Sequence, residues 1–427
     1  MDYREALAYM DGMQWYGSKP GLERVSALLT ALGSPQDELR FVHVAGTNGK
    51  GSCAAMTASV LRAAGLRTGL FTSPYLQRFN ERMQIDGREI PDETLAALVT
   101  RLQPIADAMP DHPTEFELMT AAALLWYRQE RCDIVVLEVG LGGRFDATNV
   151  IACPECAVIM NIGLDHTAVL GDTVEQIAFE KAGIIKPGCE VVLYPQQESV
   201  EQVIRARCAA LGAQLHRAEP EALVSDFDSL EGQAFRYRGV SYAIPLLGAH
   251  QLLNAAVVIE LAQVLRGRGW PISPEALERG LYAVRWPARF ELVHEEPAVI
   301  VDGGHNPQCA LSVARALERY FPGQRRVLLV GVLADKDYPE LFRILDPAAD
   351  AYVCVAPNSP RALSSDALAA QLAATGKPVT ACGSIREGIE TALTQAEAED
   401  AMVCAVGSLY MAGEIRAYFI LDTHKTA

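Results

Sequence analysis

Short apolar runs alternate with longer segments that carry helix signals along the chain before residue 285. Each run is short enough for a buried strand, and Gly65 closes the first small-residue helix. We predict strands at residues 41–45, 68–71, 134–139 and 157–162. We predict a helix that follows a glycine-rich turn after the first strand and ends at about residue 64, and helices at 91–109, 115–131, 251–268 and 274–284. Strands that alternate with helices of this length predict βαβ units, and therefore a mostly parallel, doubly wound sheet.

The pattern changes at two places. Residues 219–245 carry short polar and aromatic pieces, which predict a small antiparallel hairpin region. Residues 285–297 are polar and contain prolines, and a second α/β series follows. Its predicted strands lie at residues 298–301, 326–330, 351–355, 378–382 and 401–406. We therefore predict an N-terminal domain at 1–287 and a smaller, Rossmann-like α/β domain at 288–427, with the boundary near Pro287.

The composition indicates a globular protein without an overall basic surface. Half of the 427 residues are hydrophobic and 21% are charged, and this length favours two or more domains. The formal net charge of −16 argues against nucleic acid or anionic membranes as partners, because phosphate groups attract basic surfaces. No apolar run approaches the ~20 residues of a membrane span, and the N-terminus carries acids where a secretory signal is basic and then apolar. We expect a cytoplasmic protein.

A glycine-rich turn follows the first predicted strand and leads directly into a helix. Its residues are Gly46, Thr47, Asn48, Gly49, Lys50, Gly51 and Ser52. Glycines allow backbone N–H groups to curl around a phosphate, and a helix N-terminus favours an anion. Lys50 adds a positive charge near the outer phosphates. The strand–turn–helix context with this lysine predicts a nucleotide-binding P-loop.

The turn departs from the strict P-loop pattern. Val44 stands where the first glycine is expected, and Gly51 separates Lys50 from Ser52. The sequence has no N-K-x-D motif, which argues against a GTPase. A second glycine cluster at residues 140–143 lacks the G-x-G-x-x-G spacing of dinucleotide sites, which argues against a dehydrogenase.

The ten cysteines do not predict a metal centre. Most lie in apolar runs and are expected to be core residues in a reducing compartment. Cys153 and Cys156 form a C-x-x-C pair, whereas a structural zinc site normally needs a second pair at suitable spacing. We expect neither zinc binding nor redox chemistry at this pair.

Six short strings follow one another in a specific order. They are AGTNGKGS from Ala45, TSPYLQRFNER from Thr72, LEVGLGGRFDATN from Leu137, GLDH from Gly163, FEKAG from Phe179 and DGGHNP from Asp302. Each string is weak evidence alone, but the ordered series is highly specific. Through it the sequence closely resembles the folylpolyglutamate synthase/dihydrofolate synthase family of the Mur ligase superfamily, over essentially the whole chain.

The resemblance implies an ATP-dependent amide ligase that requires Mg²⁺. In this family the terminal γ-carboxylate of a folate attacks the γ-phosphate of ATP, which gives an acyl phosphate and ADP. The amine of L-glutamate then attacks the acyl carbon, and phosphate leaves. Both steps bring anions together, so divalent cations and fixed positive charges must offset the repulsion. The resemblance implies two Mg²⁺ ions.

The resemblance also implies a set of metal ligands. Ser73 and His166 each follow a predicted strand, and Glu138 lies at the carboxyl end of another, where ligands collect in doubly wound sheets. Lys181 matches a lysine that is carbamylated in this family and contacts Mg²⁺. A lysine that is partly desolvated beside a metal can lose its proton and react with CO₂, which gives an anionic oxygen ligand.

Further residues match nucleotide and folate contacts of the family. Asn254 matches an asparagine at the adenine, Arg289 an arginine at the phosphates, and Asp302 an acid at the ribose. His305 and Asn306 are expected to face the incoming glutamate or the acyl phosphate. The segments expected at the folate are Thr114, Glu115, Phe116 and Glu117, and Phe145, Asp146 and Ala147. The residues expected to act in catalysis are Lys50, His166, Lys181 and His305.

The sequence departs from the family pattern at two places. Ala288 stands where the family usually has glycine before the matched arginine. Residues 18–20 read Ser-Lys-Pro, where enzymes that also use dihydropteroate commonly carry an apolar-Asp-Leu triplet. Folylpolyglutamate synthesis is therefore the favoured activity, with dihydrofolate synthesis as a second one.

Two other functions remain as alternatives. Another Mur-type ligase, acting on a cell-wall nucleotide peptide, would use the same ATP chemistry but usually carries an N-terminal UDP-binding domain. We expect no such domain, because the phosphate loop already starts at Gly46. A non-catalytic nucleotide-binding regulator would not need Glu138, His166 and Lys181 together. We expect small-molecule partners (a folate or dihydropteroate, L-glutamate and ATP) and a monomer.

Overall fold

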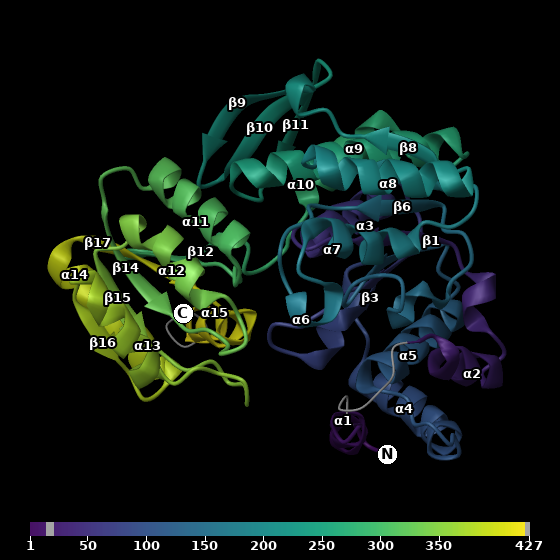
Figure 1. The fold of residues 1–427 in the computed structure, drawn as a ribbon, viewed down its shortest axis with the longest axis horizontal. Helices are drawn as coiled ribbons and strands as arrows, with labels where there is room; N and C mark the ends of the chain where they lie inside the picture. Colours follow the sequence, from purple (N-terminus) through teal and green to yellow (C-terminus); the bar gives the residue numbers. More distant parts are fainter. Residues whose placement is uncertain (14–20, 423–427) are drawn as a thin grey trace. The chain divides into compact units, whose positions relative to one another are not determined.

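The computed structural model describes residues 1–13 and 21–422, so the departure at residues 18–20 lies outside the described residues. Contacts divide the chain into two compact units. The N-terminal unit holds residues 1–224, 236–242 and 253–284, and the C-terminal unit holds 225–235, 243–252 and 285 onwards. Each unit combines helices with a sheet (Figure 1), which confirms the predicted α/β class. The domain boundary near Pro287 stays a prediction.

An eight-stranded sheet lies at the centre of the N-terminal unit, in the order β4-β3-β2-β5-β1-β6-β7-β8. The strands are β1 Phe41–Ala45, β2 Thr68–Phe71, β3 Met83–Ile85, β4 Arg88–Glu89, β5 Ile134–Glu138, β6 Cys156–Ile159, β7 Glu190–Leu193 and β8 Gln214–Arg217. The strands from β2 to β8 in this order pair in parallel, as predicted. Their carboxyl ends therefore share one edge, which collects the loops after β1, β2, β5 and β6.

Strands β3 and β4 form an antiparallel hairpin that the sequence analysis missed. Asp86 and Gly87 connect them, and both have positive φ. An Asp-Gly pair with positive φ at both residues is typical of a two-residue hairpin turn. The dipeptide was thus a readable signal for this hairpin.

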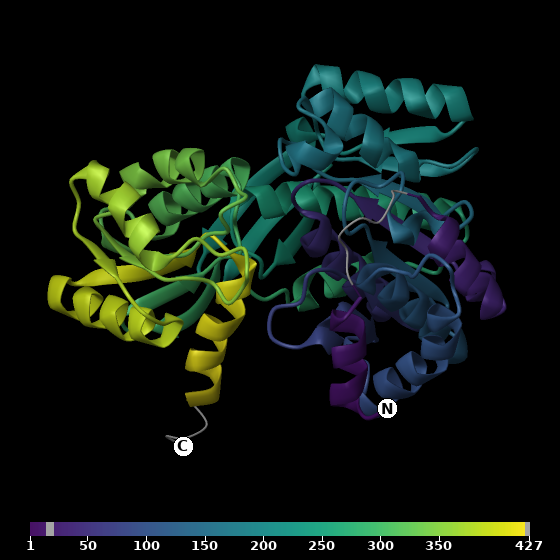
Figure 2. The same cartoon turned by 60° about the horizontal axis from the view of Figure 1, so that its bottom comes forward.

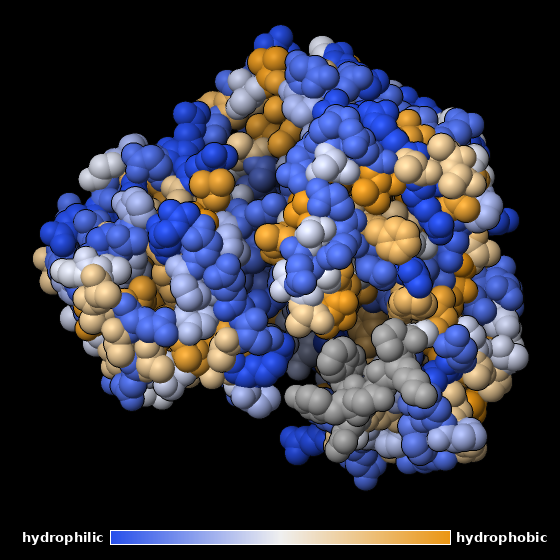
Figure 3. Space-filling model, viewed as in Figure 1, coloured by the Kyte–Doolittle hydropathy of each residue, from blue (hydrophilic) through white to orange (hydrophobic). Residues whose placement is uncertain are grey.

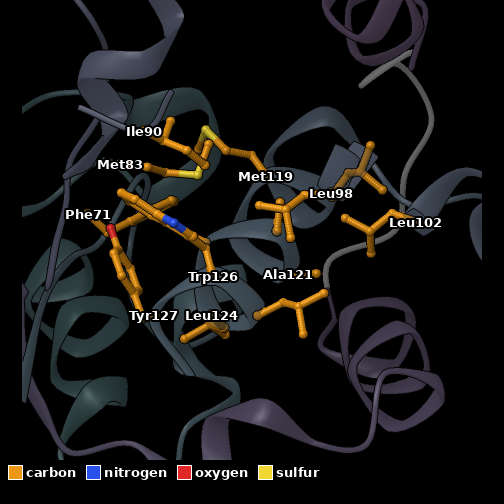
Figure 4. Packing of buried hydrophobic residues seen from close by; sticks show 14 of the residues in the cluster. Phe71, Met83, Ile90, Leu98, Leu102, Met119, Ala121, Leu124, Trp126 and Tyr127 are labelled. Atoms are coloured by element: carbon orange, nitrogen blue, oxygen red, sulfur yellow. The ribbon is translucent and has the colours of Figure 1, made fainter. Parts of the chain in front are cut away.

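Helices cover both faces of the N-terminal sheet. They are α1 Tyr3–Asp11, α2 Glu23–Ala31, α3 Lys50–Ala63, α4 Asp92–Asp107, α5 Glu115–Gln129, α6 Thr167–Leu170, α7 Val174–Lys181, α8 Glu198–Leu211, α9 Ala249–Gly267 and α10 Pro274–Ala283. One core joins α1, α2, α4 and α5 to β2 and β3, and Figure 4 shows part of it around Phe71, Met83 and Trp126. A second core joins α7 and α8 to β6 and β7.

Helix α10 approaches α3 closely. A side-chain carbon at Gly280 would lie 2.4 Å from the Cα of Val60, so only glycine fits there. The hydroxyl of Ser59 donates to the carbonyl of Gly280 at 2.7 Å and fixes the same crossing. This packing holds α3, whose first turn forms part of the predicted phosphate site.

A six-stranded sheet lies at the centre of the C-terminal unit, in the order β12-β13-β17-β14-β15-β16. The strands are β12 Glu291–Glu295, β13 Ala298–Val301, β14 Arg325–Val330, β15 Ala351–Cys354, β16 Val379–Ala381 and β17 Ala401–Val406. All five predicted strands are confirmed and run parallel. Strand β12 is antiparallel and lies within the segment that we interpreted as a polar connection.

Helices also cover both faces of the C-terminal sheet, as Figure 2 shows. They are α11 Pro307–Tyr320, α12 Tyr338–Leu345, α13 Ser365–Leu372, α14 Ile385–Glu399 and α15 Leu409–Asp422. Leu328 and Val330 join the core beneath α11 and α12. Gly388 of α14 lies against Val353 and Val355, which point to the opposite face. The sheet is therefore buried on both sides, as parallel sheets usually are.

A three-stranded sheet accounts for the predicted hairpin region. Its strands are β9 Leu223–Ser229, β10 Gly232–Tyr237 and β11 Val240–Ile244, in the order β11-β10-β9. Figure 3 shows apolar residues scattered over a largely polar face. Leu164, Val169 and Phe179, around α6 and α7, are exposed apolar residues. Within residues 1–13 and 21–422, no helix has the length and apolar character that a bilayer crossing requires.

Candidate active site

The predicted phosphate loop occupies the carboxyl end of β1 and leads into α3. Gly49 caps the helix with φ of +82°, a conformation that glycine adopts without strain. A side-chain carbon at Gly46 would lie 2.6 Å from the Cβ of Met160, at the end of β6. Both glycines are therefore required by the local backbone. The N-terminus of α3, with Lys50 in its first turn, faces this edge of the sheet.

Part of the loop is fastened to the segment that follows β6. The backbone N–H groups of Thr47 and Asn48 donate to the carbonyl of Asn161, at 2.7 and 3.2 Å. The Thr47 hydroxyl donates to the Gly163 carbonyl at 3.0 Å and accepts the Gly163 N–H at 3.1 Å. These two loop N–H groups are already engaged, so an incoming phosphate depends chiefly on the first N–H groups of α3.

The ammonium groups of Lys50 and Lys181 converge on one carbonyl. Lys50 Nζ donates to the carbonyls of Gly46 and Thr47, at 3.0 and 3.1 Å. Lys181 Nζ donates to the same Gly46 carbonyl at 2.9 Å. Two lysine side chains thus lie at the mouth of the loop, where the phosphates of a nucleotide are expected.

Lys181 is an unusual lysine because its side chain is buried. It ends α7 with only 4% of its surface exposed. Burial, and then the charge of Lys50, lower the pKa of Lys181 from 10.5 to about 7, against the opposing effect of Asp165 and Asp146. A large fraction of the side chain is therefore a neutral amine near neutral pH, the form that reacts with CO₂.

Ser73 and Glu138 meet at the ends of β2 and β5. The Ser73 N–H donates to Glu138 Oε2 at 3.2 Å, and the Glu138 side chain is 4% exposed. A buried carboxylate next to a serine offers oxygen donors of the kind that Mg²⁺ prefers. These two residues have the chemistry expected of metal ligands.

His166 lies in a different environment. Its side chain is 43% exposed, its φ is +50°, and it caps the short helix α6. The Nε2 atom lies 3.9 Å from Asp165 Oδ1. In the described part of the chain, no three His, Cys, Asp or Glu side chains are grouped as a metal site. The expected set contains only two residues of these types, Glu138 and His166, so its assembly would depend on Ser73, Lys181 and the phosphates.

The first folate segment forms the start of α5 and is held by a buried ion pair. Thr114 caps the helix, and Glu117 accepts the Thr114 N–H at 2.7 Å in a capping box. Arg24 of α2 pairs with Glu117 at 3.0 Å, with both side chains largely buried. Arg82 donates to Glu115 at 2.8 Å. Thr114 and Glu117 therefore have clear structural roles, whatever they contribute to a ligand.

Phe116 packs on the second glycine cluster. Its ring meets Phe71 edge-on, with 5.9 Å between ring centroids. A side-chain carbon at Gly140 would lie 2.5 Å from the Phe116 ring. The glycine at this position thus admits the ring, so the glycine cluster has a packing explanation that needs no dinucleotide.

The second folate segment belongs to a loop between β5 and the short helix η3 (Ala147–Val150). Phe145 is 44% exposed, and the guanidinium of Arg144 lies 4.4 Å from its ring centroid. Asp146 is buried, and burial raises the pKa of its carboxyl despite several hydrogen bonds. Ala147 is buried beside it. The segment thus offers one exposed aromatic ring beside a buried acid.

This loop is packed tightly against the end of α7. The Arg144 N–H donates to the Glu180 carbonyl at 2.9 Å. A side-chain carbon at Gly183 would lie 2.4 Å from the Cα of Arg144, and one at Gly143 would lie 3.1 Å from the Cα of Lys181. The proposed folate loop and the buried lysine are therefore in direct contact through backbone atoms.

Asn254 lies next to the phosphate loop. It belongs to α9 and is buried, and its Oδ1 atom lies 2.8 Å from the position a Gly49 side-chain carbon would occupy. The placement beside Gly49 is compatible with a contact to the nucleotide.

Asp302 organises the corresponding edge of the C-terminal sheet. It follows β13, and its two oxygens accept the N–H groups of Phe290 and Gly304, at 2.8 and 2.7 Å. The carboxylate therefore fixes the residue after Arg289 and the residue before His305. His305 Nδ1 lies 3.0 Å from the Gly303 carbonyl, and Asn306 caps α11.

The family preference for glycine before Arg289 has a structural reason. Ala288 has φ of +54°, in the left-handed region that glycine tolerates best. Arg289 Nη1 lies 3.3 Å from the Ala288 carbonyl. The backbone shape survives the change to alanine, at a cost in strain.

Sequence reasoning missed several residues of this region. Arg24 carried no motif of its own, because only the fold brings it to Glu117. Thr148 stands in a quoted string but was given no role, and the structure shows that it bonds Asp146. His43 did carry a signal, as a polar residue within an apolar strand. It is fully buried, and its Nε2 lies 2.9 Å from Thr148 Oγ1. The C-x-x-C pair splits into an exposed Cys153 and a buried Cys156.

Comparisons with known proteins find matches over nearly the whole chain. Residues 44–262 match the Mur ligase middle domain, and residues 288–409 match the Mur ligase glutamate ligase domain. Folylpolyglutamate synthase of Lacticaseibacillus casei is 36% identical over 97% of this chain and 98% of its own length. Dihydrofolate synthase/folylpolyglutamate synthase of Bacillus subtilis is 39% identical over 84% of this chain and 86% of its own length.

Solved structures of similar proteins also superpose on nearly the whole chain. The folylpolyglutamate synthase of Mycobacterium tuberculosis complexed with ADP and AMPPCP superposes with a TM-score of 0.89 at 32% identity, over 98% of this chain and 99% of that one. A folylpolyglutamate synthase complex with AMPPCP and folate gives a TM-score of 0.86 at 33% identity, over 98% of this chain and 100% of that one.

Proposed function

This chain belongs to the folylpolyglutamate synthase/dihydrofolate synthase family of Mur ligases, and from that premise we propose that it is an ATP-dependent ligase joining L-glutamate to the γ-carboxyl of a tetrahydrofolate. The convergence of Lys50 and Lys181 on the Gly46 carbonyl carries the proposal. A binding protein without catalysis has no need for a buried, readily deprotonated lysine beside a phosphate loop.

The phosphate loop would hold the outer phosphates of ATP during the first step. The N-terminus of α3 offers backbone N–H groups to the anion. Lys50 would give up its hydrogen bonds to the Gly46 and Thr47 carbonyls and donate to the phosphate instead. The folate γ-carboxylate would attack the γ-phosphate, giving an acyl phosphate and ADP. The amine of glutamate would then displace phosphate from the acyl carbon. Fixed positive charge at the loop offsets the repulsion between these anions.

We propose that the site binds Mg²⁺, two ions by the resemblance to the family, because most of the expected donors are oxygen atoms.

 The ligands we propose are Ser73, Glu138, His166 and a carbamylated Lys181. When bound, Mg²⁺ supplies charge neutralisation at the phosphates. The buried Glu138 beside Ser73 and the lowered pKa of Lys181 both favour this assignment.

The remaining assignments concern the other ligands. We propose Thr47, Asn48, Gly49, Gly51, Ser52, Asn254, Arg289 and Asp302 for the nucleotide, with His305 acting at the acyl phosphate or the glutamate. The folate would lie against the segments 114–117 and 145–147, where the Phe145 ring is exposed to a flat heterocycle. We further propose a cytoplasmic monomer that binds small molecules only.

The decisive experiment measures ADP release with glutamate and three alternative acceptors: tetrahydrofolate, dihydropteroate, or no folate. We expect release with tetrahydrofolate and a glutamylated product by mass spectrometry. Release with dihydropteroate as well would add dihydrofolate synthase activity, which the name of the Bacillus subtilis relative includes. Release that is independent of any folate or of glutamate would refute the proposal.

A variant of the phosphate loop tests the catalytic residue directly. Lys50→Ala should abolish glutamate-dependent ADP formation while leaving the melting temperature nearly unchanged, because the N–H groups of α3 remain. Arg62→Ala is a matched control, since it removes a positive charge from the exposed far end of the same helix. Normal turnover by a folded Lys50→Ala protein would contradict the assignment of the loop.

A further inference from the structure

His43 is a polar residue in a place that suits an apolar one. It occupies the middle of β1 between Val42 and Val44, and none of its surface is exposed. Burial lowers the pKa of His43 to about 3, so the ring is neutral at physiological pH. Its Nδ1 atom has no hydrogen-bond partner within the described residues. A buried nitrogen without a hydrogen-bond partner lowers stability. A histidine at this position therefore calls for a compensating role, and the contact of its other nitrogen is where to look for one.

That other contact is the first of a directed series. His43 Nε2 lies 2.9 Å from Thr148 Oγ1, and the Thr148 hydroxyl donates to Asp146 Oδ1. The Thr148 hydroxyl has a single hydrogen, which it donates in the hydrogen bond to the Asp146 carboxylate. The Thr148 oxygen must therefore accept the hydrogen bond from His43. The neutral ring therefore carries its proton on Nε2, and the bare nitrogen is Nδ1. The series runs from His43 through Thr148 to Asp146.

The Asp146 carboxylate accepts hydrogen bonds from two parts of one loop and so connects them. Its Oδ1 also accepts the Thr148 N–H at 3.0 Å, and its Oδ2 accepts the Leu141 N–H at 2.9 Å. The carboxylate thus links the start of the loop after β5 to the turn η3. Phe145 lies between these two anchors, with its ring exposed.

We propose that His43 and Thr148 are positioning residues that orient the Asp146 carboxylate and thereby hold the Phe145 segment in the shape that binds the folate. The inference rests on the proposed function, because it takes this loop as the folate side of the site. Neither residue touches the substrate. An aliphatic residue at position 43 would fill the strand equally well but would leave the Thr148 hydroxyl free to rotate away from the carboxylate.

Substitutions at the two positions separate positioning from stability. Thr148→Val keeps the shape of the side chain but loses the hydroxyl, and Thr148→Ser retains it. We expect Thr148→Val and His43→Leu each to raise the KM for tetrahydrofolate about tenfold, with the KM for ATP within about twofold of the unchanged protein. Thr148→Ser should restore most of the lost affinity. The double variant should have the same KM for tetrahydrofolate as either single variant, because both substitutions break the same series of hydrogen bonds from His43 to Asp146.

A control variant loses a buried hydrogen bond elsewhere in the N-terminal unit. Tyr237→Phe removes the donor to Glu260, a buried contact of 2.7 Å, and should lower the melting temperature without changing the KM for the folate. Equal rises in both KM values for Thr148→Val, or an unchanged KM for the folate, would overturn the inference.

A readout independent of turnover distinguishes this inference from the proposed function. Hydrogen exchange of residues 140–149 should accelerate in His43→Leu and Thr148→Val, since the N–H groups of Leu141 and Thr148 depend on Asp146. If the unchanged protein ligates no folate, the proposed function fails, and faster exchange still supports the series as a brace of the loop. Unchanged exchange in both variants would overturn the positioning role even in an active folate ligase.

Discussion

Burial changes what a single lysine can do. Lys181 Nζ rests on the Gly46 carbonyl beside Lys50, and its pKa is lowered to about 7. Below this pH the amine takes up a proton and loses its reactivity toward CO₂. The carbamylation of a CO₂-depleted protein should therefore slow as the pH falls from 8 to 6, and reactivation by bicarbonate should follow the same trend.

Substitutions of Lys181 distinguish a carbamate from a simple cation. Lys181→Ala should be nearly inactive, and a short carboxylic acid in the buffer should restore some turnover by occupying the vacated space. Lys181→Arg keeps a positive charge but forms no carbamate, so it should be as inactive as the alanine variant. Lys186→Arg is the control, because Lys186 donates to the Asn149 carbonyl and arginine can do the same. Near-normal rates for Lys181→Arg would end the carbamate proposal.

A second residue carries strain that can be relieved. Ala288 has φ of +54°, and glycine adopts this conformation without a clash of its Cβ atom. Ala288→Gly should therefore raise the free energy of unfolding by about 1 kcal/mol, measured by thermal or urea unfolding. Ala314→Gly, in the middle of α11, should instead lower it by about 1 kcal/mol. A destabilised Ala288→Gly protein would show that the left-handed backbone is not strained.

At the scale of elements, one ion pair connects α2 to the start of α5. Arg24 and Glu117 are both largely buried, and Asp111 adds a second, exposed partner at 3.2 Å. Arg24→Ala would leave the Glu117 carboxylate buried without its cation, and we expect a loss of about 3 kcal/mol in unfolding free energy. The exposed pair of Arg78 and Asp92 provides the comparison, because Arg78→Ala should cost less than about 1 kcal/mol. Equal losses would mean that burial of the first pair has no energetic consequence.

The elements themselves were predictable where burial is symmetrical. Strands such as β6 and β17 are covered on both faces, so their sequences are continuous apolar runs that can be read directly. Strand β12 lies at an edge, holds only two apolar residues among five and is followed closely by Pro297, so it resembled a connection. An edge strand forms because it pairs with a neighbouring strand, here β13. The residues of the strand alone do not show that pairing.

The candidate site was predictable only as far as motifs reach. Lys50 and Lys181 stand in recognisable strings, but their meeting at one carbonyl depends on the register of β1 and the end of α7. Asp302 was expected at the ribose, and the structure adds two backbone N–H groups that it holds in place. Such long-range contacts follow from the fold, so the sequence alone gave no access to them.

At the scale of the whole molecule, the two units differ in which segments they hold. Residues 225–235 and 243–252 belong to the C-terminal unit although they precede residue 285. Tyr320 explains part of this, because its hydroxyl accepts the Gly248 N–H at 3.0 Å and also bonds Asp228. A cut at Pro287 would therefore separate these two segments from their contacts on α11.

A truncated chain tests how activity is distributed. Residues 1–287 keep the phosphate loop but lack Arg289 and Asp302, so we expect weak binding of Mg·ATP and no ligase turnover. Calorimetric titration with a nucleotide and an ADP-release assay would measure the two properties separately. Adding residues 288–427 as a second polypeptide is a useful control, since restored turnover would show that the fragment is folded. Ligase activity of the fragment alone would contradict the assignment of Arg289 and Asp302.

The fastening of Thr47 and Asn48 to Asn161 has a thermodynamic consequence for nucleotide binding. A loop that is already held by the segment after β6 loses little conformational freedom when a ligand arrives, so few residues have to be ordered during association. The entropy of binding would then be dominated by released water and counter-ions instead of by the chain. Nucleotide affinity should accordingly depend more strongly on salt concentration than on mutations that alter loop flexibility.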